Sequence, residues 1–90
     1  MSVQIKFMNK ANEEKLKEIL VEVFDIEDSV GIQRLEDLEK IEENLHWDSL
    51  AIISLIAACE SEFKFAMDIE DYEKISSIST IKSVLSKNNF

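Results

Sequence analysis

The 90-residue chain contains no proline and a single glycine, Gly31. Tight turns between β-strands depend on these two residue types, because glycine tolerates positive φ angles and proline presets the turn geometry. A β-rich domain of this length would need more of both. The scarcity of turn residues therefore favours a helical chain with long, irregular connections.

Cysteine occurs once, at Cys59, so an internal disulfide bond is excluded. No apolar run approaches the ~18 residues that span a bilayer. The N-terminal sequence MSVQIKFMNK lacks the cationic and apolar regions of a secretory signal. We therefore expect a cytoplasmic monomer with no membrane insertion. Its 90 residues, 46% of them hydrophobic, suit one globular domain over residues 1–90.

Positive charge is also scarce. The chain has 10 Lys and Arg residues and 19 Asp and Glu residues, so its net charge is −9. Nucleic acids and anionic membranes repel an acidic surface, so neither is expected as a partner. An acidic surface suits partners with basic docking patches, but it can also serve solubility alone. The charge indicates a class of partner without identifying one.

The clearest helical pattern lies in ANEEKLKEILVEVFDI, residues 11–26. Asn12 is predicted to be the N-cap, because asparagine caps helices well and two acids follow it at the positive end of the helix dipole. Residues 3–8 are interpreted as the start of the same helix or as a loose arm. One face of the helix is apolar and is expected to enter the core: Leu16, Ile19, Leu20, Val23 and Phe24.

A second helix is predicted over residues 49–63, with Asp48 as its N-cap. Its core face comprises Ile52, Leu55, Ile56, Cys59 and Phe63, and Cys59 is expected to be a small core residue rather than a reactive thiol. A second strip lies on another side: Leu50, Ile53, Ser54, Ala57 and Ser61. This strip indicates either a helix buried over most of its surface or a docking face for partners beside an exposed Ser49.

Residues 25–47 form a long acidic connection in which a short helix is predicted at residues 35–41. Long loops in small domains are usually functional or held down by side chains. Four apolar residues are expected to hold this one: Ile32, Leu35, Leu38 and Ile41.

A short helix is predicted at residues 70–75, and a last helix runs from Ser77 or Ser79 to Lys87, followed by a frayed tail. Three longer helices and one short helix imply an all-α fold. We expect a four-helix bundle with one long loop, which lies between its first and second helices.

Ser49 and His46, the only histidine, are candidates for a nucleophilic pair. The G-x-S-x-G motif of many serine hydrolases is absent, because Trp47 and Ala51 occupy its glycine positions. A lone histidine beside a loop tryptophan is more often a surface or packing residue. We therefore expect a protein that is not an enzyme, with a small hydrolase as the competing hypothesis.

No metal site is expected from the sequence. One histidine and one cysteine cannot build a zinc site without several carboxylates. Asp25, Glu27, Ser29 and Glu36 fall at positions 1, 3, 5 and 12 of a calcium-binding loop, but position 6, where the turn requires glycine, is Val30. A solvated acidic loop is the simpler interpretation.

The sequence WDSLAIISLIAACESEF, residues 47–63, resembles the phosphopantetheine attachment region of acyl carrier proteins, whose core motif is Asp-Ser-Leu at the start of the second helix. The likeness continues through the short acidic segment DIEDYEKI and the Ser/Thr-rich segment SSISTIKSVL. The first helix and the acidic loop also fit, so the resemblance covers nearly the whole chain and implies the four-helix bundle of acyl carriers. The triplet alone is a weak signal, and its position in a small acidic helical chain makes it specific.

The resemblance implies that a phosphopantetheinyl transferase attaches 4′-phosphopantetheine from coenzyme A to Ser49, with Asp48 as motif residue and helix cap. The arm ends in a thiol that carries acyl groups as thioesters, so the protein would be a carrier and not a catalyst. Acyl-loading and acyl-transfer enzymes with basic patches would dock on a set of exposed residues: Leu50, Ile53, Ser54, Ala57 and Glu60.

The chain departs from fatty-acid carriers near the attachment residue. His46 stands where many of them have glycine, Trp47 precedes the motif, and Ala51 and Ser54 stand where they usually place acids. We therefore expect a specialised biosynthetic pathway, for a polyketide, a lipid or a surface polysaccharide. Two alternatives remain open: an aminoacyl or peptidyl carrier, including a D-alanyl carrier, and an unmodified carrier-like helical adaptor.

Overall fold

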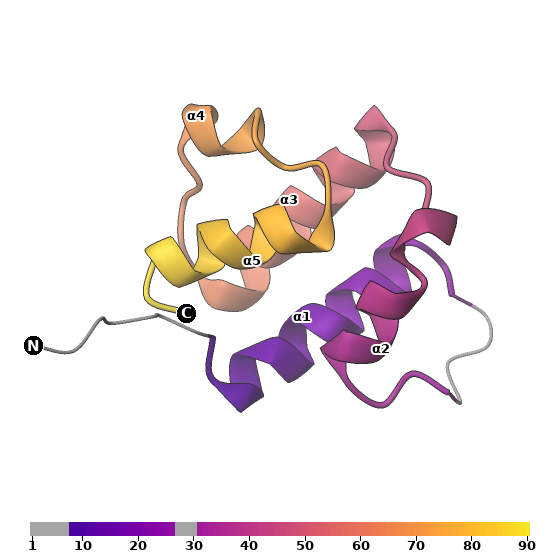
Figure 1. The fold of residues 1–90 in the computed structure, drawn as a ribbon. Helices are drawn as coiled ribbons and strands as arrows, with labels where there is room; N and C mark the ends of the chain where they lie inside the picture. The colour runs from indigo at the N-terminus through magenta and orange to yellow at the C-terminus, as the bar shows by residue number, and fades with distance from the viewer. Residues whose placement is uncertain (1–7, 27–30) are drawn as a thin grey trace, which may run out of the picture.

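The computed structural model describes residues 8–26 and 31–90, and in these ranges the fold is all-helical, with no β-strand (Figure 1). The predicted fold class is confirmed at this level. The described residues contain five α-helices and one 3₁₀ helix, which are α1 (Lys10–Val23), α2 (Leu35–Lys40), η1 (Glu42–Asn44), α3 (Ser49–Phe63), α4 (Ile69–Tyr72) and α5 (Ile78–Lys87).

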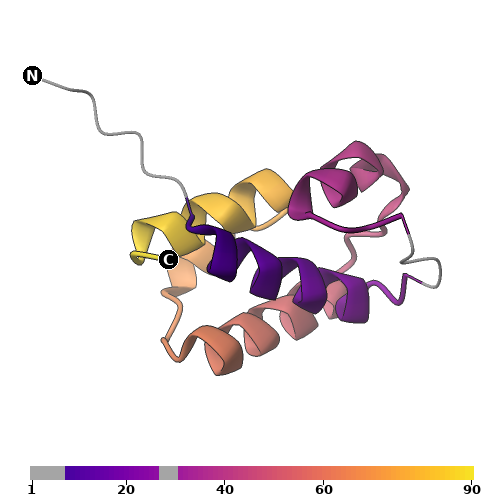
Figure 2. The ribbon, with the colours of Figure 1, turned by 90° about the horizontal axis from the view of Figure 1, so that it is seen from below.

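The helices enclose a single hydrophobic core. Figures 1 and 2 show α3 on one side of the bundle and α2 and α5 on the other, with α1 running alongside both layers. Burying a large aliphatic side chain contributes roughly 1.5–3 kcal/mol relative to leaving it exposed, so this core supplies most of the stabilisation. The fully buried apolar side chains come from α1, α2, α3 and α5: Leu16, Leu20, Leu38, Leu55, Cys59, Ile78, Ile81 and Leu85.

The predicted apolar face of α1 is confirmed, since Leu16, Ile19 and Leu20 are buried and the other two residues pack against the core. The predicted N-cap is wrong. Asn9 caps α1, because its side-chain oxygen accepts the backbone N–H of Asn12 at 2.8 Å. Asn12 instead donates its side-chain amide to the Phe90 carbonyl at 3.3 Å, a contact between residues far apart in the sequence. Residues 3–7 of the predicted arm lie outside the described residues.

The C-terminal residues also differ from the prediction, since they fold back onto the core and do not fray. The Phe90 ring lies 5.1 Å from that of Phe63 and 5.3 Å from that of Phe65, measured between centroids. Its backbone N–H donates to the Leu85 carbonyl at 2.9 Å, and its own carbonyl accepts the Asn9 N–H at 3.3 Å. The end of α5 is thereby joined to the beginning of α1.

The connection before α3 packs against the core through its apolar residues, as predicted. Within it, α2 lies inside the predicted range, Leu35 and Leu38 are buried, and Ile32 and Ile41 pack against the core. The 3₁₀ helix η1 was not predicted. Its Glu42 carboxylate accepts the Ile78 N–H at 2.5 Å, which caps the first turn of α5 from a distant part of the chain.

The two C-terminal helices begin close to their predicted positions. Of the two proposed caps, Ser77 is the one used, since its hydroxyl accepts the Thr80 N–H at 3.2 Å at the start of α5. The predicted helix at residues 70–75 is shorter, because α4 ends at Tyr72 and turns follow. Figure 1 shows α4 at the edge of the bundle that lies away from α1.

One ion pair fastens α4 to α5. Asp71 is 1% exposed and is the only buried charged residue in the described part of the chain. The Lys87 Nζ lies 3.2 Å from both oxygens of its carboxylate, and the Lys74 Nζ lies 3.9 Å from one of them. The inward side of α4 is therefore fixed by charge rather than by apolar packing.

Candidate functional site

The predicted site lies at the beginning of α3, and its local structure agrees with the prediction. Asp48 has extended backbone angles, and its Oδ1 accepts the Ala51 N–H at 2.8 Å, as an N-cap does. Ser49 is the first helical residue and is exposed. An exposed hydroxyl thus stands at the positive end of the α3 dipole, beside first-turn N–H groups that have no helical acceptor.

No hydrogen bond joins Ser49 to the neighbouring histidine in the described residues. The side chain of His46 is 89% exposed, and its Nε2 lies 4.0 Å from Asp48 Oδ2. In the described residues, the Ser49 hydroxyl makes no hydrogen bond to His46 or to another side chain. A nucleophilic serine requires a base within hydrogen-bond reach, so this geometry does not support the hydrolase hypothesis.

Trp47 anchors the chain immediately before the site. Its ring packs against Phe24, just beyond the end of α1, with ring centroids 4.9 Å apart and a tilt of 60°. Its buried Nε1 has no hydrogen-bond partner among the described residues. Such aromatic pairs contribute about 0.5–1.5 kcal/mol beyond their buried area. Trp47 therefore has a packing role, fixing the direction in which the chain enters α3.

The outward side of α3 is exposed, so the alternative of a helix buried over most of its surface is wrong. Leu50 is 73% exposed and Ile53 is 64% exposed, whereas Leu55 on the opposite face is fully buried. Ser54, Ala57 and Ser61 are also exposed. No charged residue occurs in α3 from Ser49 to Cys59, although the whole chain carries a net charge of −9.

Glu60, the fifth predicted docking residue, is arranged differently from the other four. It is half-buried, and its Oε2 accepts the Met67 N–H at 2.8 Å and the Tyr72 hydroxyl at 3.4 Å. Partial burial, the Glu60 charge and this hydrogen bond raise the pKa of Tyr72. Glu60 is therefore bound within its own chain, at the junction of α3 and α4.

Four large apolar side chains of the described residues are exposed. Among the described residues they occur only on α3 and α4, and they are Leu50, Ile53, Ile69 and Tyr72. We refer to these four side chains as the α3–α4 apolar surface. Sequence periodicity identified its α3 half, but a four-residue helix is too short to show a periodic face, so its α4 half was missed.

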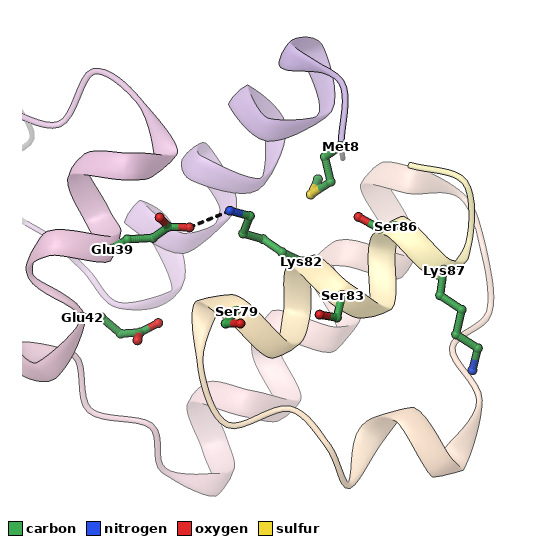
Figure 3. A pocket seen from close by; sticks show the side chains of 8 residues that line it. All are labelled: Met8, Glu39, Glu42, Ser79, Lys82, Ser83, Ser86 and Lys87. Atoms are coloured by element: carbon green, nitrogen blue, oxygen red, sulfur yellow. Dashed lines mark hydrogen bonds and ion pairs between the residues drawn. The ribbon is translucent and has the colours of Figure 1, made fainter. Parts of the chain in front are cut away.

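Two grooves of the described residues lie outside the predicted site. One, of about 680 Å³, separates α2 and η1 from α5, and the ion pair between Lys82 and Glu39, 2.7 Å long, crosses it (Figure 3). Another, of about 430 Å³, lies between α1 and α3 and includes Ser54. Neither is lined by Ser49 or Asp48.

The described residues contain no group of three or more His, Cys, Asp or Glu side chains that could hold a metal ion. Of the four positions considered for a calcium loop, Glu27 and Ser29 lie outside the described residues.

Cys59 is fully buried, and burial, followed by the nearby Glu60 charge, raises the pKa of its thiol to about 12. We expect the native protein to show no reaction with an aromatic disulfide reagent at mildly alkaline pH, because the thiolate is the reacting form. Denaturation should release one reactive thiol per chain. Rapid labelling of the native protein would contradict the placement of Cys59 in the core.

No protein-family model matches this chain, and no solved structure matches it. Across residues 8–26 and 31–90, every helix is too short or too polar to cross a lipid bilayer.

Proposed function

We propose that the chain is a carrier protein of the acyl-carrier type, to which a transferase attaches 4′-phosphopantetheine through the Ser49 hydroxyl. The observation that carries the proposal is the exposed Ser49 at the first position of a helix capped by Asp48, next to an exposed apolar strip. The arrangement of three longer helices, a short α4 and a long connection containing α2 and η1 agrees with the acyl-carrier bundle.

The attachment is a phosphoryl-group transfer in which atoms and charges balance. The Ser49 oxygen forms a bond to the phosphorus that bears pantetheine in coenzyme A, and the pyrophosphate bond breaks to release 3′,5′-ADP. The hydroxyl proton passes to a base of the transferase. The arm then supplies a thiol that binds acyl groups as thioesters. The product phosphodiester is an anion at the α3 N-terminus, where the helix dipole stabilises negative charge by about 0.3–1 kcal/mol.

The residues of this chain have separate roles in that process. Asp48 holds the first turn of α3, so Ser49 is presented in one orientation. Trp47 keeps the preceding segment against the core. Leu50 and Ile53 offer apolar contacts to the transferase and to the loading and transfer enzymes.

The uncharged face of α3 favours a specialised pathway. Carriers of fatty-acid synthesis use acids on this helix, and here the face contains none before Glu60. An acyl cargo is proposed. An aminoacyl or peptidyl cargo would use the same attachment chemistry.

The test is incubation of the purified protein with coenzyme A and a promiscuous phosphopantetheinyl transferase. We expect a mass gain of one phosphopantetheine per chain, together with one new thiol that reacts in the native state, since Cys59 is buried. Ser49→Ala should gain no mass and should fold normally. Ser83→Ala, the same change at an exposed serine of α5, should be modified like the wild type. A wild-type chain that several transferases leave unmodified would refute the proposal and favour the adaptor.

A further inference from the structure

Glu60 makes two contacts that both end on the segment containing α4. Its Oε2 accepts the Met67 N–H at 2.8 Å, just before α4, and the Tyr72 hydroxyl at 3.4 Å, at the end of α4. Hydrogen bonds to a charged acceptor are about twice as strong as those between neutral groups. One carboxylate oxygen therefore fastens both ends of the α4 segment to α3.

The two sides of α4 are held by different helices. Asp71 points inward to Lys87 of α5, whereas Tyr72 reaches outward to Glu60 of α3. Ile69 lies three positions before Tyr72, so both side chains share one side of α4. This side is exposed, with Ile69 at 75% and Tyr72 at 38%. The contact with Glu60 thus determines where α4 places its two exposed apolar side chains.

Glu60 lies on the side of α3 that carries Leu50 and Ile53. Glu60 follows Ile53 by seven positions and Ala57 by three, so it lies on the outward strip of α3. From Ser49 to Glu60 the helix rises by about 16 Å. The exposed apolar side chains of α3 therefore begin beside Ser49, and the hydrogen bonds of Glu60 link the same side of α3 to α4.

We propose that Glu60 is a positioning residue: it holds α4 against α3 so that α4 completes the apolar surface on which the enzyme that modifies Ser49 docks. The inference rests on the proposed function and changes the role expected for Glu60, from a partner contact to an internal support. The occupant is a partner enzyme with an apolar docking site rimmed by basic side chains.

The charges around the surface favour this occupant over a second copy of the chain. The centre of the surface on α3 is uncharged, while exposed acids border it at Asp48 and, on or beside α4, at Glu70 and Glu73. Two copies would bring together chains that each carry a net charge of −9. An apolar centre with an acidic border fits a partner with the complementary arrangement.

The first measurement is amide hydrogen exchange of the full chain by NMR. In Glu60→Ala, the Met67 N–H should exchange about tenfold faster or more, because it loses its acceptor. Glu60→Gln keeps an acceptor of the same shape and should retain much of the protection. Glu62→Ala changes an exposed acid of the same helix and should leave exchange unchanged. Unchanged Met67 exchange in Glu60→Ala would overturn the inference.

The second measurement is steady-state modification of Ser49 by a transferase. Glu60→Ala and Ile69→Ser should each raise KM by about fivefold and leave kcat unchanged, as expected for a lost docking contact. Their effects should not add in the double variant, because Glu60 acts through α4. Additive effects, or a Glu60→Gln variant as impaired as Glu60→Ala, would show that Glu60 contacts the enzyme directly and would overturn the inference.

The outcomes separate the two proposals. A wild-type chain that no transferase modifies would remove the proposed function and this inference together. A wild-type chain that is modified, with additive variants or unchanged KM, would remove only the inference.

Discussion

Leu55→Ala is expected to lower the free energy of unfolding by about 2–5 kcal/mol, the range measured for truncating buried leucines. Leu55 is fully buried on the inward face of α3, and the helix is surrounded by other core residues that leave little freedom to close the cavity. Urea denaturation followed by circular dichroism measures the change.

Leu50→Ala is the matched control, since it removes the same atoms from the same helix at a position that is 73% exposed. Its effect on stability should stay within about 0.5 kcal/mol. The same variant should weaken docking, because Leu50 begins the α3–α4 apolar surface. Equal destabilisation by the two changes would contradict the orientation of α3, and with it the exposure of the strip beside Ser49.

Lys87→Met is expected to lower the free energy of unfolding by about 1–3 kcal/mol, because it leaves a buried carboxylate without its main partner. The affected group is Asp71, whose two oxygens each lie 3.2 Å from the Lys87 Nζ. The side chain of Lys87 is 56% exposed, so water moderates the loss and the full cost of a broken buried pair is not expected. Thermal unfolding at neutral pH measures the effect.

Lys82→Met, also on α5, is the matched control for this change. Lys82 pairs with Glu39 at 2.7 Å, and both side chains are about one-third exposed. Surface pairs of this kind contribute about 0–1 kcal/mol. If the two variants lost the same stability, the Asp71 pair would not be the fastening of α4 that its burial indicates.

Glu60→Ala and Lys87→Met test the contacts on opposite sides of α4. Glu60 holds the outward side of α4 and Asp71 its inward side, and the buried residues Met67 and Ile75 flank the short helix. A four-residue helix is far below the length at which an isolated helix is stable in water, so its position depends on tertiary contacts. This dependence makes α4 sensitive to changes in the residues that contact it.

Local sequence patterns predicted α3 and its first turn closely. An aspartate before an apolar 3.6-residue repeat specifies both the cap and the buried face, since capping and amphipathicity act within a few residues. The position of Ser49 and the burial of Leu55 followed from that pattern, whereas it left open whether Leu50 is buried or exposed. The face of α1 and the two buried leucines of α2 were predicted for the same reason.

Contacts between distant parts of the chain decided the remaining features. The choice of Asn9 over Asn12 as a cap and the packing of Phe90 depend on α1 meeting the end of α5. Likewise, the capping of α5 by Glu42 and the binding of Glu60 to α4 join residues that sequence patterns do not relate. By itself the sequence determined which faces are apolar and where the helix carrying Ser49 begins. Only the tertiary structure decided which polar side chains bind within the chain, because a hydrogen bond depends on where folding places its two partners.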